Sequence, residues 1–280
     1  MPLKNLYKIC LLLCLLAGSL LACDVLPTVT YNGTPVISST SATPSQASTT
    51  NSTPLNTWIQ AVPGVDLRYE DWKSPGVDED TVVIVRFNLS RVHIKVGYQP
   101  TKAMGIGNWM KQERALAVIN GGYFDQQNQA AGLVVSNGQA FGTSYTGFGG
   151  MLSVDAQGNV SLRSLSDQPY DPNSEQLQQA TQSSPMLIVN GKRTQFSANS
   201  ASSRRSVVAI DEQGRLLLIT SSAQAFTLDE LADLLVSSDL SIKTALNLDG
   251  GASTGLYVNA GNQHVAIDSF VGLPIVIVVK

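Results

Sequence analysis

The sequence has few of the residues that most often bind metals or carry protons at neutral pH. Its 280 residues include two histidines, His93 and His264, and no H-E-x-x-H segment, which excludes a histidine-rich zinc site. The three cysteines, Cys10, Cys14 and Cys23, all lie near the N-terminus. The remainder of the chain has no thiol, so its stability must come from an apolar core and not from disulfides.

Charge is also sparse. Charged residues make up 14% of the chain, and the formal net charge is −3. This balance gives no bulk attraction to nucleic acid, so we expect no nucleic-acid partner. After the N-terminal segment, no apolar run is long enough to span a bilayer.

The N-terminal segment is typical of an export signal. Lys4 and Lys8 precede an apolar run, and small residues follow before Cys23. The segment L-L-A-C at 20–23 resembles the bacterial lipobox, which implies cleavage before Cys23 and a lipid on its sulfur; an ordinary secretory signal cut nearby is the alternative. We expect residues 1–22 to be a lipoprotein signal peptide and the protein to be extracytoplasmic, with this lipid as its only membrane anchor.

Composition divides the rest of the chain in two. Residues 23–56 are dominated by Ser, Thr, Pro and Asn and contain few large apolar groups. Such a segment buries too little surface to offset its ordering entropy, which predicts a disordered tether behind the lipidated Cys23. Residues 57–280 have the length of one large domain.

Short apolar runs with turn signals between them dominate this domain. Such runs occur at 81–98, 115–121, 132–141, 149–162 and 272–280. The S-N-G-Q and A-Q-G-N segments predict hairpin turns, because Asn and Gly tolerate a positive φ.

Helical spacing is rarer. The best helix is predicted over 227–238, where Thr227 and Glu230 can form a capping box. Weaker helices are predicted over 107–115 and 173–182. The pattern as a whole predicts an α+β fold, a strand-rich single domain with a mixed or antiparallel sheet and a few helices.

The segment G-A-S-T-G at 251–255 matches the G-x-S-x-G pattern of serine hydrolases around Ser253. A nucleophile elbow needs a helix after the serine, but the residues that follow are β-like and interrupted by glycine. No acid lies between Ser253 and His264, so the order Ser, Asp, His cannot be formed there. A serine hydrolase with another order of triad residues stays an alternative.

Four polar segments at the ends of apolar runs carry more information. They are N-G-G-Y-F-D (120–125), S-S-P-M-L-I-V-N-G-K (183–192), S-S-R-R-S-V-V-A-I-D (202–211) and N-L-D-G-G-A-S (247–253). In order and spacing they resemble the motifs of the phosphodiester glycosidase family, of the N-acetylglucosamine-1-phosphodiester alpha-N-acetylglucosaminidase type. The resemblance covers about 60–280. This sequence departs from the family pattern at Ala252 and Ala209, which replace glycine, and at Tyr123, which replaces phenylalanine.

The resemblance implies hydrolysis of glycosyl-1-phosphodiesters in envelope glycans or exopolysaccharide, with a phosphoglycan or glycosyl phosphodiester as substrate. This cleavage develops positive charge on the sugar and negative charge on the departing phosphate, for which a carboxylate and a guanidinium are the natural partners. We interpret Asp249 as the central carboxylate, either nucleophile or base for water, and Asp125 as the second carboxylate. Arg205 would bind the phosphate through two N–H groups, with Arg204 as a solvated neighbour.

The remaining site candidates are neutral. Asn120 would hold a sugar hydroxyl or orient the central carboxylate. Gly250 and Gly251 would let backbone N–H groups approach the substrate, and Ser253 and Thr254 would bond sugar or phosphate oxygens.

Each candidate also has a structural interpretation. The two acids can be turn residues, Asn120 can belong to a tight turn, Arg205 can form a surface ion pair, and Tyr123 and Phe124 can belong to the core. The sequence predicts no cofactor, although a divalent cation such as calcium on the phosphate stays open. A non-catalytic carbohydrate-binding module of the same fold is the alternative function, because the methyl group of Ala252 could narrow the site.

Overall fold

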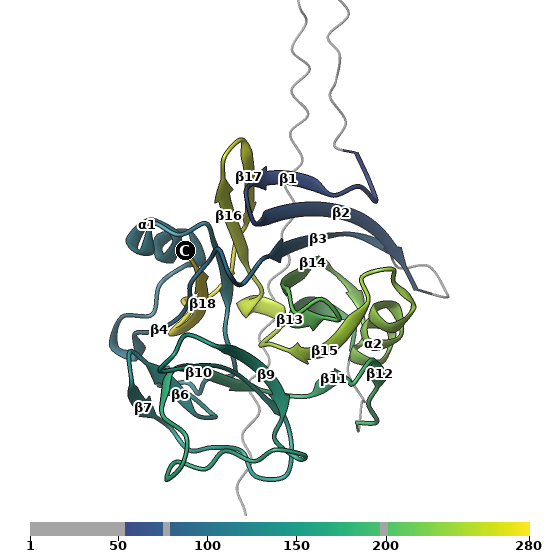
Figure 1. The fold of residues 1–280 in the computed structure, drawn as a ribbon. Coiled ribbons are helices and arrows are strands. Elements are labelled where there is room, and N and C mark those ends of the chain that lie inside the picture. Colours follow the sequence, from purple (N-terminus) through teal and green to yellow (C-terminus); the bar gives the residue numbers. More distant parts are fainter. Residues whose placement is uncertain (1–53, 75–78, 197–200) are drawn as a thin grey trace, which may run out of the picture. The chain divides into compact units, whose positions relative to one another are not determined.

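The computed structural model describes residues 54–74, 79–196 and 201–280. The predicted signal peptide, Cys23 and nearly all of the predicted tether lie outside the described residues. Residues 51–280 form one compact unit, drawn from blue to yellow in Figure 1. No helix within the described ranges is long and apolar enough to cross a membrane.

The largest of the three sheets in the described residues has eight strands. In spatial order they are β1 (Ile59–Val62), β2 (Val65–Lys73), β3 (Glu79–Phe87), β14 (Leu216–Phe226), β13 (Ser203–Asp211), β15 (Ile242–Asn247), β11 (Met186–Val189) and β12 (Lys192–Arg193). We call this sheet the large sheet. Its central strands come from the C-terminal half of the chain.

Two five-stranded sheets complete the described part of the fold. The first, the β5 sheet, contains β17 (Gln263–Ile267), β16 (Leu256–Ala260), β5 (Ala117–Asn120), β18 (Ile275–Val279) and β4 (Ile94–Tyr98). The second, the β10 sheet, contains β7 (Gln139–Phe141), β6 (Val134–Ser136), β10 (Leu177–Ser183), β8 (Gly150–Asp155) and β9 (Val160–Ser164).

Helices are few. The described residues form two α-helices, α1 (Ile106–Glu113) and α2 (Leu228–Ser237), and two 3₁₀ turns, η1 (Pro100–Lys102) and η2 (Gly251–Ser253). Every strand pair within the three sheets is antiparallel. The prediction of a strand-rich single domain is confirmed, but the fold is mostly β with antiparallel sheets, and the α+β assignment is corrected accordingly.

The central strands of the large sheet are buried on both faces. In β14, Leu216 and Leu218 pack in the cluster that joins the large sheet to the β5 sheet, whereas Leu217 and Ile219 pack in a second cluster with α2. Successive side chains of a strand point to opposite faces, so an unbroken apolar run such as L-L-L-I serves two cores at once. Helix α1 covers the outer face of the β5 sheet through Trp109, which is fully buried.

The helices predicted over 227–238 and 107–115 are confirmed as α2 and α1. Helix α2 begins after Thr227, whose side chain accepts a hydrogen bond from the Glu230 N–H, while the Glu230 carboxylate accepts one from the Thr227 N–H. The box satisfies backbone donors that a helix start otherwise leaves free. Both predicted hairpin turns are present, with Asn137 and Gly138 in one and Gly158 in the other at positive φ.

The helix predicted over 173–182 is wrong, because most of that stretch is strand β10. Its four glutamines make the stretch look helical, but β10 pairs with β6 on one side and β8 on the other. Gln179 and Gln182 are buried and use their side-chain oxygens to accept backbone N–H groups of Val96, Leu133 and Tyr145. Tertiary pairing here overrides local helix propensity.

Candidate active site

Asp249 lies directly after β15, where the large sheet meets the β5 sheet. Its carboxylate is half-buried, and Oδ1 accepts a 2.9 Å hydrogen bond from the Gly250 N–H. Burial raises the pKa of Asp249, and hydrogen bonds from the Ser253 hydroxyl and the Gly250 N–H oppose that rise. The carboxylate is thus partly desolvated and held by two donors.

Asn120, at the end of β5, fixes the loop that carries this carboxylate. It is 1% exposed, and its Nδ2 donates a 2.6 Å hydrogen bond to the Asp249 carbonyl. Its Oδ1 accepts hydrogen bonds from the Ser206 hydroxyl at 2.6 Å and from the Gly255 N–H at 3.2 Å. Because these bonds occupy the amide, the geometry favours the orienting role predicted for Asn120 over contact with a sugar hydroxyl.

The loop that carries Asp249 starts beside Arg205. Val207 of β13 pairs with Asn247, the last residue of β15, in an antiparallel ladder. The next residue of the loop, Leu248, donates its N–H to the Ser206 carbonyl at 2.9 Å. The predicted guanidinium and carboxylate therefore lie on neighbouring segments of the chain.

Arg205 is a buried cation without a carboxylate partner. It is 7% exposed, its Nε donates to the Phe226 carbonyl at 2.9 Å, and its Nη2 donates to the Ala201 carbonyl at 2.7 Å. Nη1 lies 3.8 Å from the point where a Cβ on Gly250 would stand. Among the ion pairs of the described residues none includes Arg205, so the surface-pair interpretation is wrong. Burial lowers the pKa of the guanidinium, which still carries its charge at neutral pH.

The two glycines after Asp249 allow the loop to pack closely against β13. They do not open space for a substrate. A Cβ on Gly250 would lie 3.0 Å from the Arg204 carbonyl, so glycine lets this loop approach β13. Gly251 has φ +59°, a conformation that glycine adopts without strain. The Gly250 N–H is occupied by Asp249 itself.

The hydroxyls of Ser253 and Thr254 are less available than predicted. Thr254 is fully buried, so its hydroxyl is not presented to a ligand. Ser253 is 6% exposed and bonds the Asp249 carboxylate. In the described residues no hydrogen bond joins Ser253 to His93 or His264, and both histidines are exposed. Ala252 is also exposed, so its methyl group faces away from the packed part of the loop.

Arg204 is not the solvated neighbour that the sequence predicts. It is 5% exposed and donates hydrogen bonds to the carbonyls of Ser222 and Asp268. Its guanidinium carbon lies 4.1 Å from the ring centroid of Phe270. The two arginines therefore occupy different surroundings, since neighbouring strand residues point to opposite faces.

Two tyrosines and Asn247 complete the site. Tyr123 donates from its hydroxyl to the Ser184 carbonyl at 2.9 Å, and Asn247 Nδ2 donates to both of these oxygens at 3.0 and 2.9 Å. Burial, followed by the charge of Asp249, raises the pKa of Tyr123 to about 12. Burial and the same charge raise the pKa of Tyr145, so both rings lie within electrostatic range of the carboxylate.

Sequence reasoning missed Asn247 and Tyr145. Asn247 is the last residue of β15 and lies two residues before Asp249, so the two-residue period of an extended chain was a usable signal. Tyr145 lies in a loop without a periodic pattern, and only the tertiary structure brings it to the site. Tyr123 and Phe124, predicted as core, are half-buried.

The model of the phosphodiester glycosidase family matches residues 113–279, which include Asn120, Arg205 and Asp249. The chain belongs to the phosphodiester glycosidase family. Members of this family are hydrolases that act on glycosyl phosphodiester linkages. No curated protein matches the sequence.

Solved structures share the fold of this family member. The catalytic domain of zebrafish N-acetylglucosamine-1-phosphodiester alpha-N-acetylglucosaminidase, auto-inhibited by its pro-peptide, is 18% identical with a TM-score of 0.61, over 77% of this chain and 82% of that one. A hypothetical protein from Synechocystis is 17% identical with a TM-score of 0.61, over 82% of this chain and 64% of that one. A putative exported protein from Burkholderia pseudomallei is 12% identical with a TM-score of 0.51, over 74% and 75% of the two chains. At these identities the likeness shows the fold alone.

In this member of the phosphodiester glycosidase family, Asp125 does not join Asp249. It is exposed, and its Oδ1 accepts backbone hydrogen bonds from Gln127 and Gln129 at 2.9 and 2.8 Å. Asp155 and Asp211 bond in the same way within D-A-Q-G-N and D-E-Q-G-R. The recurrence of D-x-Q-G/N-x is a sequence signal for a turn acid. This geometry favours the structural interpretation of Asp125 over that of a second catalytic carboxylate.

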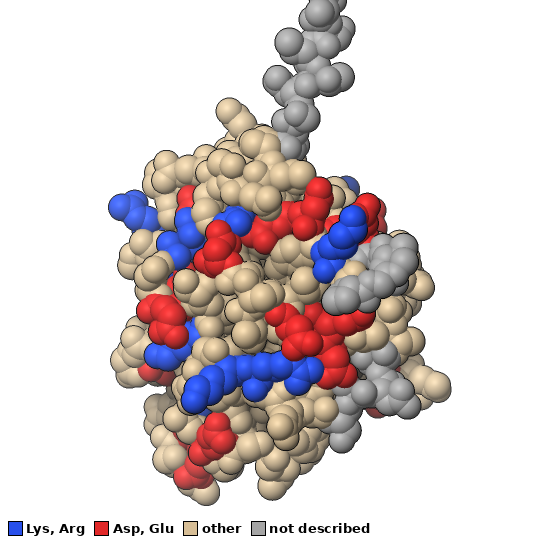
Figure 2. Space-filling view, turned by 90° about the vertical axis from the view of Figure 1, so that its right-hand side faces the viewer, with Lys and Arg blue, Asp and Glu red and all other residues tan. Residues whose placement is uncertain are grey.

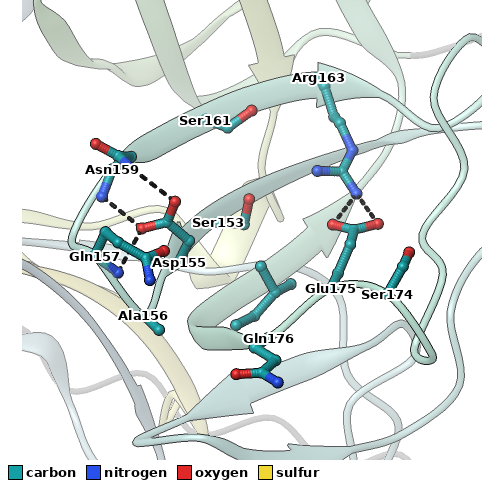
Figure 3. A pocket seen from close by; sticks show the side chains of 11 residues that line it. Ser153, Asp155, Ala156, Gln157, Asn159, Ser161, Arg163, Ser174, Glu175 and Gln176 are labelled. Carbon is teal, nitrogen blue, oxygen red and sulfur yellow. Dashed lines mark hydrogen bonds and ion pairs between the residues drawn. The ribbon is translucent and has the colours of Figure 1, made fainter.

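The turn of Asp155 borders a polar cavity of about 480 Å³, shown in Figure 3. Its charged side chains already have partners: Asp155 accepts from Asn159, and Arg163 binds both oxygens of Glu175 at 2.7 and 2.6 Å. The first bond closes the β8–β9 turn, and the second joins β9 to the segment before β10. The cavity thus contains no free charge for a ligand.

Some charges elsewhere are also paired. On the face in Figure 2, basic and acidic side chains lie beside each other. Near α2, Arg193 forms ion pairs with Asp229 and Asp233. In the described ranges, no cluster of three or more His, Cys, Asp or Glu side chains could hold a metal ion.

Proposed function

We propose that this protein hydrolyses glycosyl-1-phosphodiesters of the N-acetylglucosamine 1-phosphate type. The observation that carries the proposal is that the buried Arg205 of β13 lies beside the loop that carries Asp249, with Arg205 Nη1 3.8 Å from the point where a Cβ on Gly250 would stand. The two groups have opposite charges, and neither neutralises the other through an ion pair. A glycosyl phosphodiester needs both groups, the carboxylate at the sugar and the guanidinium at the phosphate.

The proposed chemistry uses each group where charge develops. Asp249 either forms a bond to the anomeric carbon itself, to be displaced later by water, or takes a proton from the attacking water. In both routes the bond from the anomeric carbon to the phosphate oxygen breaks, and its electron pair stays on the phosphate. Arg205 offers Nη1 and the second hydrogen of Nη2 to that phosphate, because its other donors bind carbonyls.

Burial makes the arrangement more effective. Attraction between a carboxylate and a developing positive charge is stronger where water is partly excluded. The half-buried Asp249 and the buried Arg205 both meet this condition. A phosphate monoester leaves readily, so a strong general acid is unnecessary, and the chain has few histidines to supply one.

We also propose that the enzyme acts outside the cytoplasm as a lipoprotein, on phosphoglycans of the envelope or on exopolysaccharide. The L-L-A-C segment at 20–23 supports this location. Labelled fatty acid should be incorporated into the wild type but not into Cys23→Ala.

The test of the activity is release of free N-acetylglucosamine from a chromogenic N-acetylglucosamine 1-phosphodiester by the full chain. Asp249→Asn should abolish release, and Arg205→Lys should lower kcat/KM by about tenfold or more, because it removes the planar pair of donors. Glu212→Gln, which removes an exposed carboxylate elsewhere, is the matched control. Release that survives Asp249→Asn would contradict the proposal.

Ser253→Ala separates this reaction from serine hydrolysis. Removing the hydroxyl takes one hydrogen bond from the carboxylate, so release should fall but persist. Ester hydrolysis lost outright in this variant would instead support the nucleophilic serine. Binding of the diester without turnover in the wild type would support the binding module.

A further inference from the structure

A second cavity adjoins the candidate active site. Its volume is about 470 Å³, within the roughly 300–1,000 Å³ usual for ligand pockets. Its lining includes Phe148, Asp167, Ser184, Pro185, Met186 and Phe196. The motifs assigned to Asp249 and Arg205 do not account for it.

Ser184 forms the wall between the cavity and the active site. Its carbonyl accepts hydrogen bonds from Tyr123 and Asn247, while the residue itself lines the cavity. A second link runs through Tyr145, whose ring stacks on Phe148 with centroids 4.7 Å apart and planes 24° apart. The charge of Asp249 contributes to the raised pKa of Tyr145, so this ring lies near the carboxylate. Its stacking partner Phe148 lines the cavity.

Phe148 is exposed yet held in place by its backbone. Its side chain is 51% exposed, and it stands between Gly147 and Gly149, which have φ +73° and +74°. A Cβ on Gly149 would lie 2.6 Å from the Ser183 carbonyl, so this loop packs tightly against the wall. The Ser166 hydroxyl also donates to the Gly147 carbonyl at 2.9 Å. An aromatic ring positioned at a cavity offers a face on which a ligand can stack.

The remaining lining groups define what the platform can accept. Asp167 is the charged residue of the lining, and Ser164, Ser166, Thr194 and Gln195 add hydroxyl and amide groups. No lysine or arginine belongs to the lining, all of which lies in the described residues. A phosphate or nucleotide would meet an acid and no cation. A neutral ring with many hydroxyls can instead stack on Phe148 and donate hydrogen bonds to Asp167.

We propose that this cavity binds the aglycone of the substrate, the group on the far side of the phosphate, and that it selects an uncharged polyhydroxyl group. The inference rests on the proposed function. Asp249 does not line the cavity, so the group bound there is not the sugar whose anomeric carbon reacts. Phe148 and Asp167 thereby determine specificity for the aglycone.

The kinetic test compares N-acetylglucosamine 1-phosphodiesters that differ in the aglycone: methyl, glycerol, the O6 of a hexose, and the nucleotide of UDP-N-acetylglucosamine. In the full-length wild type, kcat/KM for the hexose diester should exceed that for the methyl diester by about tenfold, mainly through KM. Phe148→Ala and Asp167→Asn should each reduce this ratio severalfold, whereas Phe148→Tyr and Glu212→Gln should retain it. The glycerol arm distinguishes a linear polyol from a sugar ring. A ratio that is the same in wild type and Phe148→Ala, or a preference for the nucleotide, would overturn the inference.

A binding measurement separates this inference from the catalytic proposal. Isothermal titration of the full chain with glucose 6-phosphate, glycerol 3-phosphate and uridine monophosphate needs no turnover. Glucose 6-phosphate should bind more tightly than the nucleotide, and Phe148→Ala should weaken it by about fivefold or more, consistent with roughly 1 kcal/mol for an aromatic contact. Binding that Phe148→Ala leaves unchanged would overturn the subsite, even if the enzyme is active. Absence of sugar release from every diester would contradict the proposed activity, and the titration would still decide the subsite.

Discussion

Asn120 and Asp249 are joined by a 2.6 Å hydrogen bond from the Asn120 amide to the Asp249 backbone carbonyl, across 129 positions of the sequence. The same amide binds Ser206 of the large sheet and Gly255, which precedes β16 of the β5 sheet. One buried side chain thus ties the loop with the carboxylate to both sheets. A catalytic group on a loop is positioned only as well as the contacts that hold the loop.

Asn120→Ala should therefore lower both stability and activity. The substitution leaves the Asp249 carbonyl, the Ser206 hydroxyl and the Gly255 N–H without their partner. Because each unsatisfied buried group costs about 1–3 kcal/mol, we expect a loss of about 3 kcal/mol in the free energy of unfolding, measured by urea denaturation. Asn259→Ala, at an exposed position of β16, is the control. An equal loss in both variants would show that Asn120 has no special role.

The raised pKa of Asp249 makes stability depend on pH in a defined direction. Burial raises the pKa in the folded state, so the folded state binds the proton more tightly than the unfolded state does. The contribution of Asp249 to the free energy of unfolding is therefore fully present below its pKa in the unfolded state. It is lost as pH rises through its pKa in the folded state. Asp249→Asn should be more stable than wild type at pH 7, and the difference should shrink as pH falls toward 3. Thermal unfolding measured across this range would contradict the assignment if the difference grew at low pH.

Asp125→Asn tests the second carboxylate. Since Asp125 accepts backbone hydrogen bonds within its own turn, we expect a loss of about 1 kcal/mol in stability and retained sugar release. Asp155→Asn is the matched variant, because its acid closes the same kind of turn. A loss of turnover in Asp125→Asn alone would restore Asp125 as a catalytic group.

Gly122 allows the segment after β5 to pass close to β10. A Cβ at this position would lie 1.9 Å from the Gln182 carbonyl. Gly122→Ala should cost about 3 kcal/mol or more, because backbone and not a flexible side chain must move. Gly105→Ala, where nothing lies within 4 Å of the added atom, should cost about 1 kcal/mol or less, as expected for alanine at the N-cap of α1. Chemical denaturation of the two variants gives the comparison, and similar midpoints would contradict the clash.

Local signals in the sequence predicted local structure well. The capping residues Thr227 and Glu230 fixed the start of α2, and the Asn-Gly turn fixed the β6–β7 hairpin. Both depend on residues a few positions apart. Likewise, the motif around Asp249 predicted a central carboxylate, which stays a prediction, and only the structure shows that the loop after β15 runs beside β13 and Arg205.

Other features depend on partners far along the chain. The glutamines of β10 became strand because two neighbouring strands pair with them, and Tyr145 reaches the site from a loop without a pattern. Arg204 and Arg205 are adjacent in sequence and equally basic, yet burial and partners distinguish them only in the folded protein. The role of Asp125, in contrast, could have been predicted from the sequence, because the pattern of its turn occurs there three times.

The strand order of the large sheet also has a consequence for how the chain folds. Phe87 of β3 pairs with Leu216 of β14, so the meander of β1, β2 and β3 keeps an open edge until the second half of the chain has been synthesised. Closing so long a loop before its contacts form makes folding slow, as in other proteins of high contact order. During that interval the apolar edge of β3 is a template for association with other chains. Truncation before β14 should therefore yield aggregates and not a smaller folded domain.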